Sequence, residues 1–248
     1  MKILCVIPSR IGSTRLSRKP LADIAGKPMI QRTYEKAMTC PDIDKVIVAT
    51  DSEEIADVIT QLGGHVEMTD PSIATGSDRV AVVANRYPQA DVIINLQGDE
   101  PFIKSHMLST LVSPYLNGEN PPMTTLACPL LYETEYDNPE IVKVLINHRG
   151  EALYFSRSPI PYFRESRTNL PPMPVWHHQG LYAYRRDFLE TYTHLPQTPL
   201  ELAEKLEQLR ALEHGYAIRV CTVNEQTLEI NTPEELERAQ LWAVEKDS

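Results

Sequence analysis

The chain has 248 residues and a formal net charge of -10 at pH 7. A general nucleic-acid binder needs a basic face over much of its surface, so this charge argues against that class, although a small anionic ligand responds to local charge and is not excluded. The apolar run at residues 3–7 is too short for a signal peptide, and no run approaches the roughly 18 apolar residues of a membrane span. We therefore expect a cytoplasmic protein that binds neither nucleic acid nor membranes.

The four cysteines show no pattern of a cross-linked or metal-binding framework. They are Cys5, Cys40, Cys128 and Cys221, and no two of them form a C-x-x-C pair. Cys5 lies in an apolar, strand-like run. We expect buried, reduced thiols rather than disulfides or a zinc site.

The first hundred residues alternate apolar, strand-like runs with helix-like segments. Strands are predicted at 3–8, 45–50, 66–69 and 91–96, and helices at 29–39, 52–62 and 78–86. This alternation predicts an α/β fold with a doubly wound, mostly parallel sheet covered on both faces. Ligands bind such sheets beyond the carboxyl ends of the strands, which directs attention to the segments 9–19, 50–51 and 97–101.

The second half of the chain is less regular. The predicted segments are an extended arm at 152–161, a polar, proline-rich loop at 164–174, a helix at 200–212, a strand at 217–223 and a closing helix from Thr232-Pro233. Leu202, Leu206, Leu209 and Leu212 have helical spacing and are expected in the core. We expect a single domain over 1–248, with 150–186 forming a small insertion or extended arm.

A basic loop follows the first predicted strand. The sequence R-I-G-S-T-R-L-S-R-K-P-L at 10–21 contains no acidic residue, and its cations are Arg10, Arg15, Arg18 and Lys19. A turn containing glycine can point backbone amides at an anion, and guanidinium groups bind phosphate oxygens in a fork. The loop matches neither a Walker motif nor a G-x-G-x-x-G motif. A triphosphate site is favoured over a solvated basic loop.

Two further motifs each allow two interpretations. In Q-G-D-E-P at 97–101, Asp99 follows a strand and could hold a metal beside bound phosphates, or the motif could be a turn or helix cap. In T-G-S-D-R at 75–79, Gly76 and Ser77 could face a base edge, although on its own the pattern favours a helix cap.

Together these motifs resemble the cytidylyltransferases of 3-deoxy-manno-octulosonate (KDO), also called CMP-KDO synthetases. The resemblance includes A-T-D at 49–51, A-L-Y-F-S-R-S-P-I-P at 152–161, H-Q-G-L-Y-A-Y-R at 178–185 and L-E-Q-L-R-A-L at 206–212. The last three blocks separate this family from sialic-acid activators and from nucleotidyltransferases of hexose phosphates. The motifs occur in the family's order and cover nearly the whole chain.

The resemblance implies a nucleotide-diphospho-sugar transferase-like fold and transfer of CMP from CTP to the anomeric hydroxyl of KDO, with release of pyrophosphate. It further implies Mg²⁺ as cofactor, a homodimer contacted through the arm, and a place in lipopolysaccharide biosynthesis. A related 2-keto sugar acid such as 8-amino-KDO, or a catalytically weak CTP-binding homologue, is the alternative.

The resemblance also assigns residues to the site. The triphosphate would meet Arg10, Ser13, Arg15 and Lys19, and cytidine would meet Thr75, Gly76, Ser77 and Arg79. Gln97 and Asp99 would lie at the reaction centre, Gln97 touching both substrates and Asp99 holding magnesium. The sugar would further meet Arg157, His178, Tyr182, Glu207 and Gln208. On the residues alone, an ordinary, partly buried histidine is the favoured interpretation of His178. Tyr182 could be a packing residue, and Glu207 and Gln208 could face water.

Two positions depart from the family. Ser17-Arg18 replace Pro-Gly, which gives the loop a further side chain and charge. Asn231 stands where the family has Asp as a second magnesium ligand; an amide oxygen can bind Mg²⁺, but without the negative charge. Glu229 would lie on the same face as Asn231 if this segment is a strand.

Overall fold

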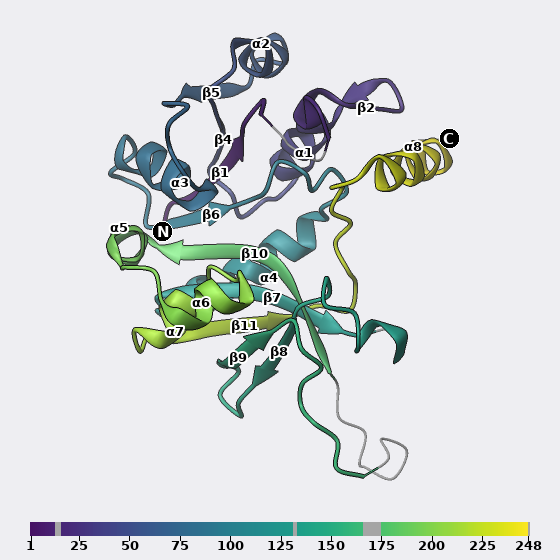
Figure 1. The fold of residues 1–248 in the computed structure, drawn as a ribbon. Coiled ribbons are helices and arrows are strands. Elements are labelled where there is room, and N and C mark those ends of the chain that lie inside the picture. Colours follow the sequence, from purple (N-terminus) through teal and green to yellow (C-terminus); the bar gives the residue numbers. More distant parts are fainter. Residues whose placement is uncertain (13–15, 131–132, 166–174, 248) are drawn as a thin grey trace. The chain divides into compact units, whose positions relative to one another are not determined.

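The computed structural model describes residues 1–12, 16–130, 133–165 and 175–247 (Figure 1). The chain forms two compact units, the first made of Met1–Val112 and Thr227–Ser248 and the second of Ser113–Gln226. The expectation of a single domain with an arm over 150–186 is not tested by this division and stays a prediction.

A parallel sheet forms the centre of the first unit. Its strands follow the order β6-β1-β4-β5, and each neighbouring pair is parallel. The strands are β1 (Ile3–Ser9), β4 (Lys45–Thr50), β5 (His65–Met68) and β6 (Val92–Asn95). The first and last residue of each strand lie within one residue of the predicted ones. The agreement arises because β1, β4 and β6 are buried almost throughout, as expected for parallel strands covered on both faces, so each is visible in the sequence as an apolar run.

Three helices separate these strands in the chain, as predicted. They are α1 (Met29–Met38), α2 (Glu53–Gln61) and α3 (Gly76–Asn85). In the sheet, Ser9 of β1 lies opposite Thr50 of β4, and Val6 lies opposite Asn95 of β6. The segments that follow these strands therefore emerge at one edge of the sheet. The predicted α/β class is confirmed.

The C-terminal segment completes the first unit. The helix α8 (Pro233–Asp247) contacts the short strand β2 (Asp23–Ile24), which pairs with β3 (Lys27–Pro28). Thr232 and Glu235 cap the helix reciprocally: the Glu235 amide donates to Thr232 Oγ1 at 3.2 Å, and the Thr232 amide donates to Glu235 Oε2 at 3.0 Å. The predicted start of this helix is confirmed.

The second unit contains a mixed sheet. Its strand β7 (Met123–Pro129) pairs in parallel with β11 (Ile218–Thr222) and antiparallel with β10 (Trp176–Arg185). The antiparallel strand β8 (Lys143–Ile146) pairs with both β10 and β9 (Ala152–Ser156). The remaining elements are η2 (Glu133–Glu135), α5 (Arg186–His194), α6 (Pro199–Glu204) and α7 (Leu209–Glu213), while α4 (Ser105–Leu116) leads into this unit from the first and η1 (Lys19–Leu21) belongs to the first.

The single helix predicted over 200–212 is wrong. The helix α6 ends where Lys205 adopts the left-handed conformation with φ 56°, and α7 begins only at Leu209. Leu202 is 47% exposed, whereas Leu206 and Leu209 are buried, so the leucine stripe does not form one core face. The spacing of the leucines predicts which side chains would lie on one face of a continuous helix. It does not predict that a single residue, here Lys205, takes a positive φ and ends the helix.

Within the expected arm over 152–161, the residues of β9 form a strand, and the arm itself stays a prediction. The segment with Glu229 and Asn231 forms no strand, so the strand alternation considered for these two residues does not apply. The loop predicted at 164–174 lies almost wholly outside the described residues. The four cysteines are buried and free, as predicted. Among the helices that the structure describes, none has the length and apolar composition needed to cross a membrane.

Candidate active site

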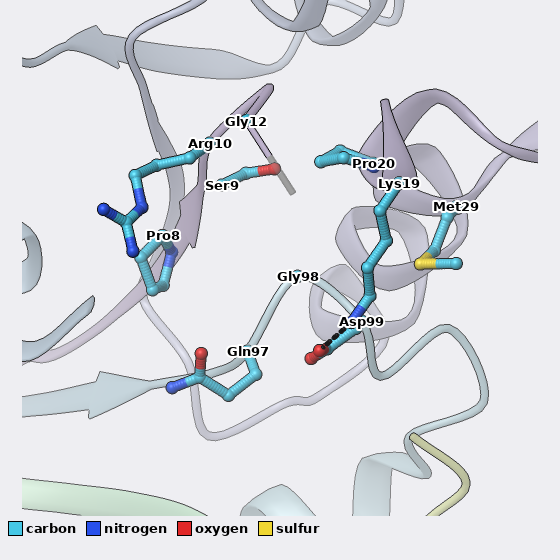
Figure 2. Close-up of a pocket in the computed structure, with 10 residues that line it drawn as sticks. All are labelled: Pro8, Ser9, Arg10, Gly12, Lys19, Pro20, Met29, Gln97, Gly98 and Asp99. Carbon is cyan, nitrogen blue, oxygen red and sulfur yellow. Dashed lines mark hydrogen bonds and ion pairs between the residues drawn. The ribbon is translucent and has the colours of Figure 1, made fainter. Parts of the chain in front are cut away.

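A cavity of about 460 Å³ lies in the first unit, at the edge where β1 and β6 end (Figure 2). The end of β1 contributes Pro8 and Ser9, and the loop after it contributes Arg10 and Gly12. The loop after β6 contributes Gln97, Gly98 and Asp99, and Lys19, Pro20 and Met29 complete the lining. The prediction that the basic loop and the Q-G-D-E-P motif meet beyond the strands is confirmed for these residues. Ser13 and Arg15, also predicted here, lie outside the described residues.

Lys19 connects two oxygen ligands predicted for magnesium. Its ammonium donates to Asp99 Oδ2 at 2.5 Å and to Asn231 Oδ1 at 2.9 Å (Figure 2 shows the first of these bonds). The Lys19 and Asp99 side chains are only 13% and 23% exposed. A carboxylate oxygen and an amide oxygen therefore converge on one cationic group, and both are the hard oxygen donors that Mg²⁺ prefers.

The segment before α8 is fixed against Asp99. The amide of Ile230 donates to the Asp99 carbonyl at 3.3 Å, and the Ile230 side chain is buried with Ile24 and Met29. The two residues that flank Ile230 are also bonded to each other: Asn231 Nδ2 donates to Glu229 Oε2 at 3.0 Å. Sequence analysis named Asn231 from the family alone; no local pattern could show that this segment returns to Asp99.

Glu100 is a buried acid that sequence analysis did not assign to the site. It is 1% exposed, and burial raises its pKa well above the ordinary value, with the neighbouring carboxylates of Glu229 and Asp99 raising it further. Glu229 is an exposed residue, and its pKa is also raised, first by partial desolvation of the carboxyl group and then by Asp99. The hydrogen bond from Asn231 and the charge of Lys19 lower it in part. These acids and Lys19 thus share one electrostatic environment.

The extra cation in the basic loop is directed away from the cavity. Arg18 has φ 52°, the left-handed conformation that glycine adopts most easily, so the backbone keeps the conformation that the family's Pro-Gly would favour. Its guanidinium pairs with Glu54 of α2, and Arg18 does not line the cavity. Arg10, in contrast, lines the cavity, and its guanidinium reaches the Ile73 carbonyl at 3.5 Å.

The T-G-S-D-R motif begins α3 beside the cavity. Thr75 Oγ1 accepts a hydrogen bond from the Asp78 amide at 3.0 Å, so the helix-cap interpretation is confirmed for Thr75. A side chain added at Gly76 would lie 3.6 Å from Pro8 and 3.8 Å from Gln97 Oε1, which places Gly76 next to two cavity residues. Contact of this motif with cytidine stays a prediction.

Polar side chains hold the motif to its neighbours. Gln97 Nε2 donates to Asn95 Oδ1 at 3.1 Å, and Asn95 Nδ2 reaches Ser77 Oγ at 3.5 Å. This leaves Gln97 in one orientation, with its amide on the cavity edge. Both Asn95 and Ser77 are buried.

Asp51 and Arg79 form a buried pair behind the loop. The Arg79 side chain is fully buried, burial lowers its pKa, and its guanidinium bonds to Thr69 and lies 3.5 Å from Asp51 Oδ2. Asp51 Oδ1 also accepts from the Ile11 amide at 3.3 Å. Asp51 was part of the A-T-D motif but was not assigned to the site; the structure shows it joining the loop after β1 to α3.

Apart from Gln97, the predicted sugar-binding residues lie in the second unit. They are Arg157, His178, Tyr182, Glu207 and Gln208. Arg157 donates through Nε to the Glu204 carbonyl at 2.9 Å and through Nη1 to the Pro139 carbonyl at 3.0 Å. The Tyr182 ring lies 5.5 Å from that of His178, while Gln208 is 3% exposed at the start of α7. These contacts give Arg157 and Tyr182 a structural role, and sugar binding by all five residues stays a prediction.

His178 is a neutral, buried histidine. Its Nε2 lies 2.9 Å from Thr125 Oγ1, and burial lowers its pKa to about 3. The interpretation of His178 as an ordinary buried histidine is supported, and it does not conflict with contact to a neutral hydroxyl. The neighbouring His177 has its pKa lowered to about 4, also by burial.

Comparison with known proteins identifies the family. The sequence pattern of the cytidylyltransferase family matches residues 4–222. The chain belongs to the cytidylyltransferase family. It is therefore an enzyme that transfers a nucleotidyl group, and the basic loop and the cavity of the first unit lie within the matched region.

Two individual relatives and one solved structure show more closely what this chain is similar to. The chain is 52% identical, over 98% of its length and 97% of the relative's, to a 3-deoxy-manno-octulosonate cytidylyltransferase of Acaryochloris marina. It is 50% identical to the protein of the same name from Syntrophotalea carbinolica, over 97% and 98% of the two chains. A solved structure of CMP:2-keto-3-deoxy-manno-octonic acid synthetase in complex with CTP superposes with a TM-score of 0.93 at 41% identity, covering 99% of this chain and 100% of that one.

Proposed function

We propose that this cytidylyltransferase transfers CMP from CTP to the anomeric hydroxyl of KDO, giving CMP-KDO and pyrophosphate. The observation that carries the proposal is the cavity in which Arg10, Lys19, Gln97 and Asp99 converge beyond the ends of parallel strands. The relatives named as KDO cytidylyltransferases, which align over almost the whole chain, support KDO as the acceptor. We further propose that the enzyme acts as a cytoplasmic homodimer in lipopolysaccharide biosynthesis.

In the proposed reaction, the anomeric oxygen of KDO forms a bond to the α-phosphorus of CTP. The bond from that phosphorus to the oxygen bridging the β-phosphate breaks, pyrophosphate leaves, and the hydroxyl proton is released. Arg10, Lys19 and Arg15 would neutralise the triphosphate, and Ser13 of the same loop would donate a hydrogen bond to it. Gln97, held by Asn95, would orient the reacting groups through its amide.

Asp99 and Asn231 would hold Mg²⁺ through the two oxygen atoms that now bond to Lys19. These donors fit the ion, since a Mg²⁺ ion beside phosphates commonly takes one or two protein ligands and completes its shell with phosphate oxygens and water. When bound, the ion supplies positive charge to the reacting phosphate and acidifies a coordinated hydroxyl.

The sugar would be recognised by a cationic group and by neutral and acidic groups of the second unit. Arg157 would meet the carboxylate of KDO, and Tyr182, Glu207 and Gln208 would meet hydroxyl groups. His178 would contact the sugar as a neutral group, because its pKa of about 3 keeps it uncharged near pH 7.

The test is pyrophosphate release from CTP and Mg²⁺ with KDO, with sialic acid and no sugar as parallel controls. Release with KDO only, together with a product of the mass of CMP-KDO, is the expected result. Absence of release with any of these, from folded protein that still binds CTP, would overturn the proposal, and 8-amino-KDO would be the next acceptor to try.

A further inference from the structure

We propose that Glu229 supplies the second negative charge of the magnesium site, acting through the side chain of Asn231. The inference rests on the proposed function, because it concerns the metal that Asp99 and Asn231 would hold. It makes Glu229 a positioning residue that orients and polarises a ligand rather than a ligand itself.

The first observation is that the cationic position has one charged oxygen and one neutral oxygen. Lys19 Nζ lies 2.5 Å from the Asp99 carboxylate and 2.9 Å from the Asn231 amide oxygen. A divalent cation at this position would meet a single protein charge in its first coordination shell. Nearby carboxylates outside that shell therefore decide how strongly it binds.

The second observation is the bond between Asn231 and Glu229. Asn231 Nδ2 donates to Glu229 Oε2 at 3.0 Å, so the carboxylate fixes which end of the amide is the oxygen. A carboxylate that accepts from the amide nitrogen also shifts electron density toward Oδ1, which strengthens that oxygen as a ligand. The arrangement resembles the carboxylate–histidine pairs of metal sites, with an amide in place of the imidazole.

The third observation is that the backbone holds both residues in place. Ile230, between them, is completely buried and bonds through its amide to the Asp99 carbonyl at 3.3 Å. The Asn231 amide donates to Glu235 Oε2 at 2.6 Å, which also accepts from Thr232 in the helix cap. Glu235 is thus committed to the cap, and Glu229 is the acid that bonds to the ligand side chain.

The geometry also explains why asparagine suits position 231 in this chain. An aspartate there would place a carboxylate oxygen about where Nδ2 now meets Glu229 Oε2 at 3.0 Å, and two carboxylates at that separation repel. We therefore expect Asn231→Asp by itself to raise metal affinity by no more than roughly threefold. In a Glu229→Gln background, the same change moves the negative charge from residue 229 to residue 231 without changing the total charge of the site.

The experiment is Mn²⁺ binding to the full chain without nucleotide, measured at pH 7.5 by electron paramagnetic resonance of free Mn²⁺. Glu229→Gln is expected to weaken binding by about tenfold, and the double variant E229Q/N231D to return it to within about threefold of the parent. The matched control is Glu237→Gln, which removes an exposed carboxylate from α8 and is expected to leave Mn²⁺ affinity unchanged. Thermal unfolding confirms that each variant is folded.

Equal Mn²⁺ affinity in Glu229→Gln and Glu237→Gln would overturn the inference. So would a folded double variant that binds no better than Glu229→Gln, because then the charge at this position does not govern binding. Pyrophosphate release by the parent enzyme is measured separately. Failure of that reaction with normal Mn²⁺ results would count against the proposed sugar and not against the role of Glu229.

Discussion

Replacing Lys19 with methionine is expected to strengthen metal binding in the absence of nucleotide while weakening CTP binding. The ammonium of Lys19 occupies the point on which Asp99 and Asn231 converge. A free metal ion must displace this group to reach both oxygens. Methionine keeps much of the length of the side chain but removes the charge.

The magnitude follows from the bonds that the metal must break. Hydrogen bonds to charged groups contribute about 1.5–3 kcal/mol. The Lys19 and Asp99 side chains are 13% and 23% exposed, so the small values of fully exposed ion pairs do not apply. Since about 1.4 kcal/mol corresponds to a factor of ten, Lys19→Met is expected to raise Mn²⁺ affinity by about 10- to 100-fold.

The assay measures Mn²⁺ binding by electron paramagnetic resonance and CTP binding by calorimetry on the same protein. Lys27→Met is the control, because Lys27 is 44% exposed and pairs with Glu35, and neither residue lines the cavity. Opposite changes for the two ligands are expected only for Lys19. If Lys19→Met binds Mn²⁺ no more tightly than the parent, the ammonium does not compete with the metal and the reasoning is refuted.

Three other substitutions test separate features. The raised pKa of Glu100 means that the fold favours its protonated form, so the stability of the parent protein should fall as pH rises above the ordinary value of 4.5. In urea titrations, Glu100→Gln should therefore be more stable than the parent near pH 7 and should lose this advantage toward pH 4.5. Arg18→Gly should leave CTP affinity, measured by calorimetry, within about threefold, since that guanidinium pairs with exposed Glu54. Glu201→Gln should lower the free energy of unfolding by about 3 kcal/mol in urea, because it leaves the buried guanidinium of Arg210 without its carboxylate.

Each of these has a contrary result. Identical stability of Glu100→Gln and the parent at every pH would show that the fold does not hold the carboxyl group neutral. A tenfold or larger loss of CTP affinity in Arg18→Gly would place that guanidinium in the site, and a loss below about 1 kcal/mol in Glu201→Gln would mean that Arg210 finds other partners or water.

The part of the cavity that sequence analysis located depends on short-range rules. The strands β1 and β6 were recognisable as apolar runs, and the rule that ligands bind beyond parallel strands placed Lys19 and Asp99 together. Asn231 and Glu229 join them through the docking of α8, which depends on packing between segments distant in the chain. The break at Lys205 depends on one backbone angle, which hydrophobic spacing does not encode.

The position of Asn231 makes the order of synthesis matter. A chain growing on the ribosome completes all the described residues that line the cavity, from Pro8 to Asp99, long before Asn231 emerges. A product truncated ahead of that residue, or trimmed there by a protease, would retain the basic loop and Asp99 but not the second oxygen that Lys19 contacts. Under the proposed function, such a fragment would be able to contact the triphosphate but not to complete the metal site, because Asn231 is translated long after Asp99.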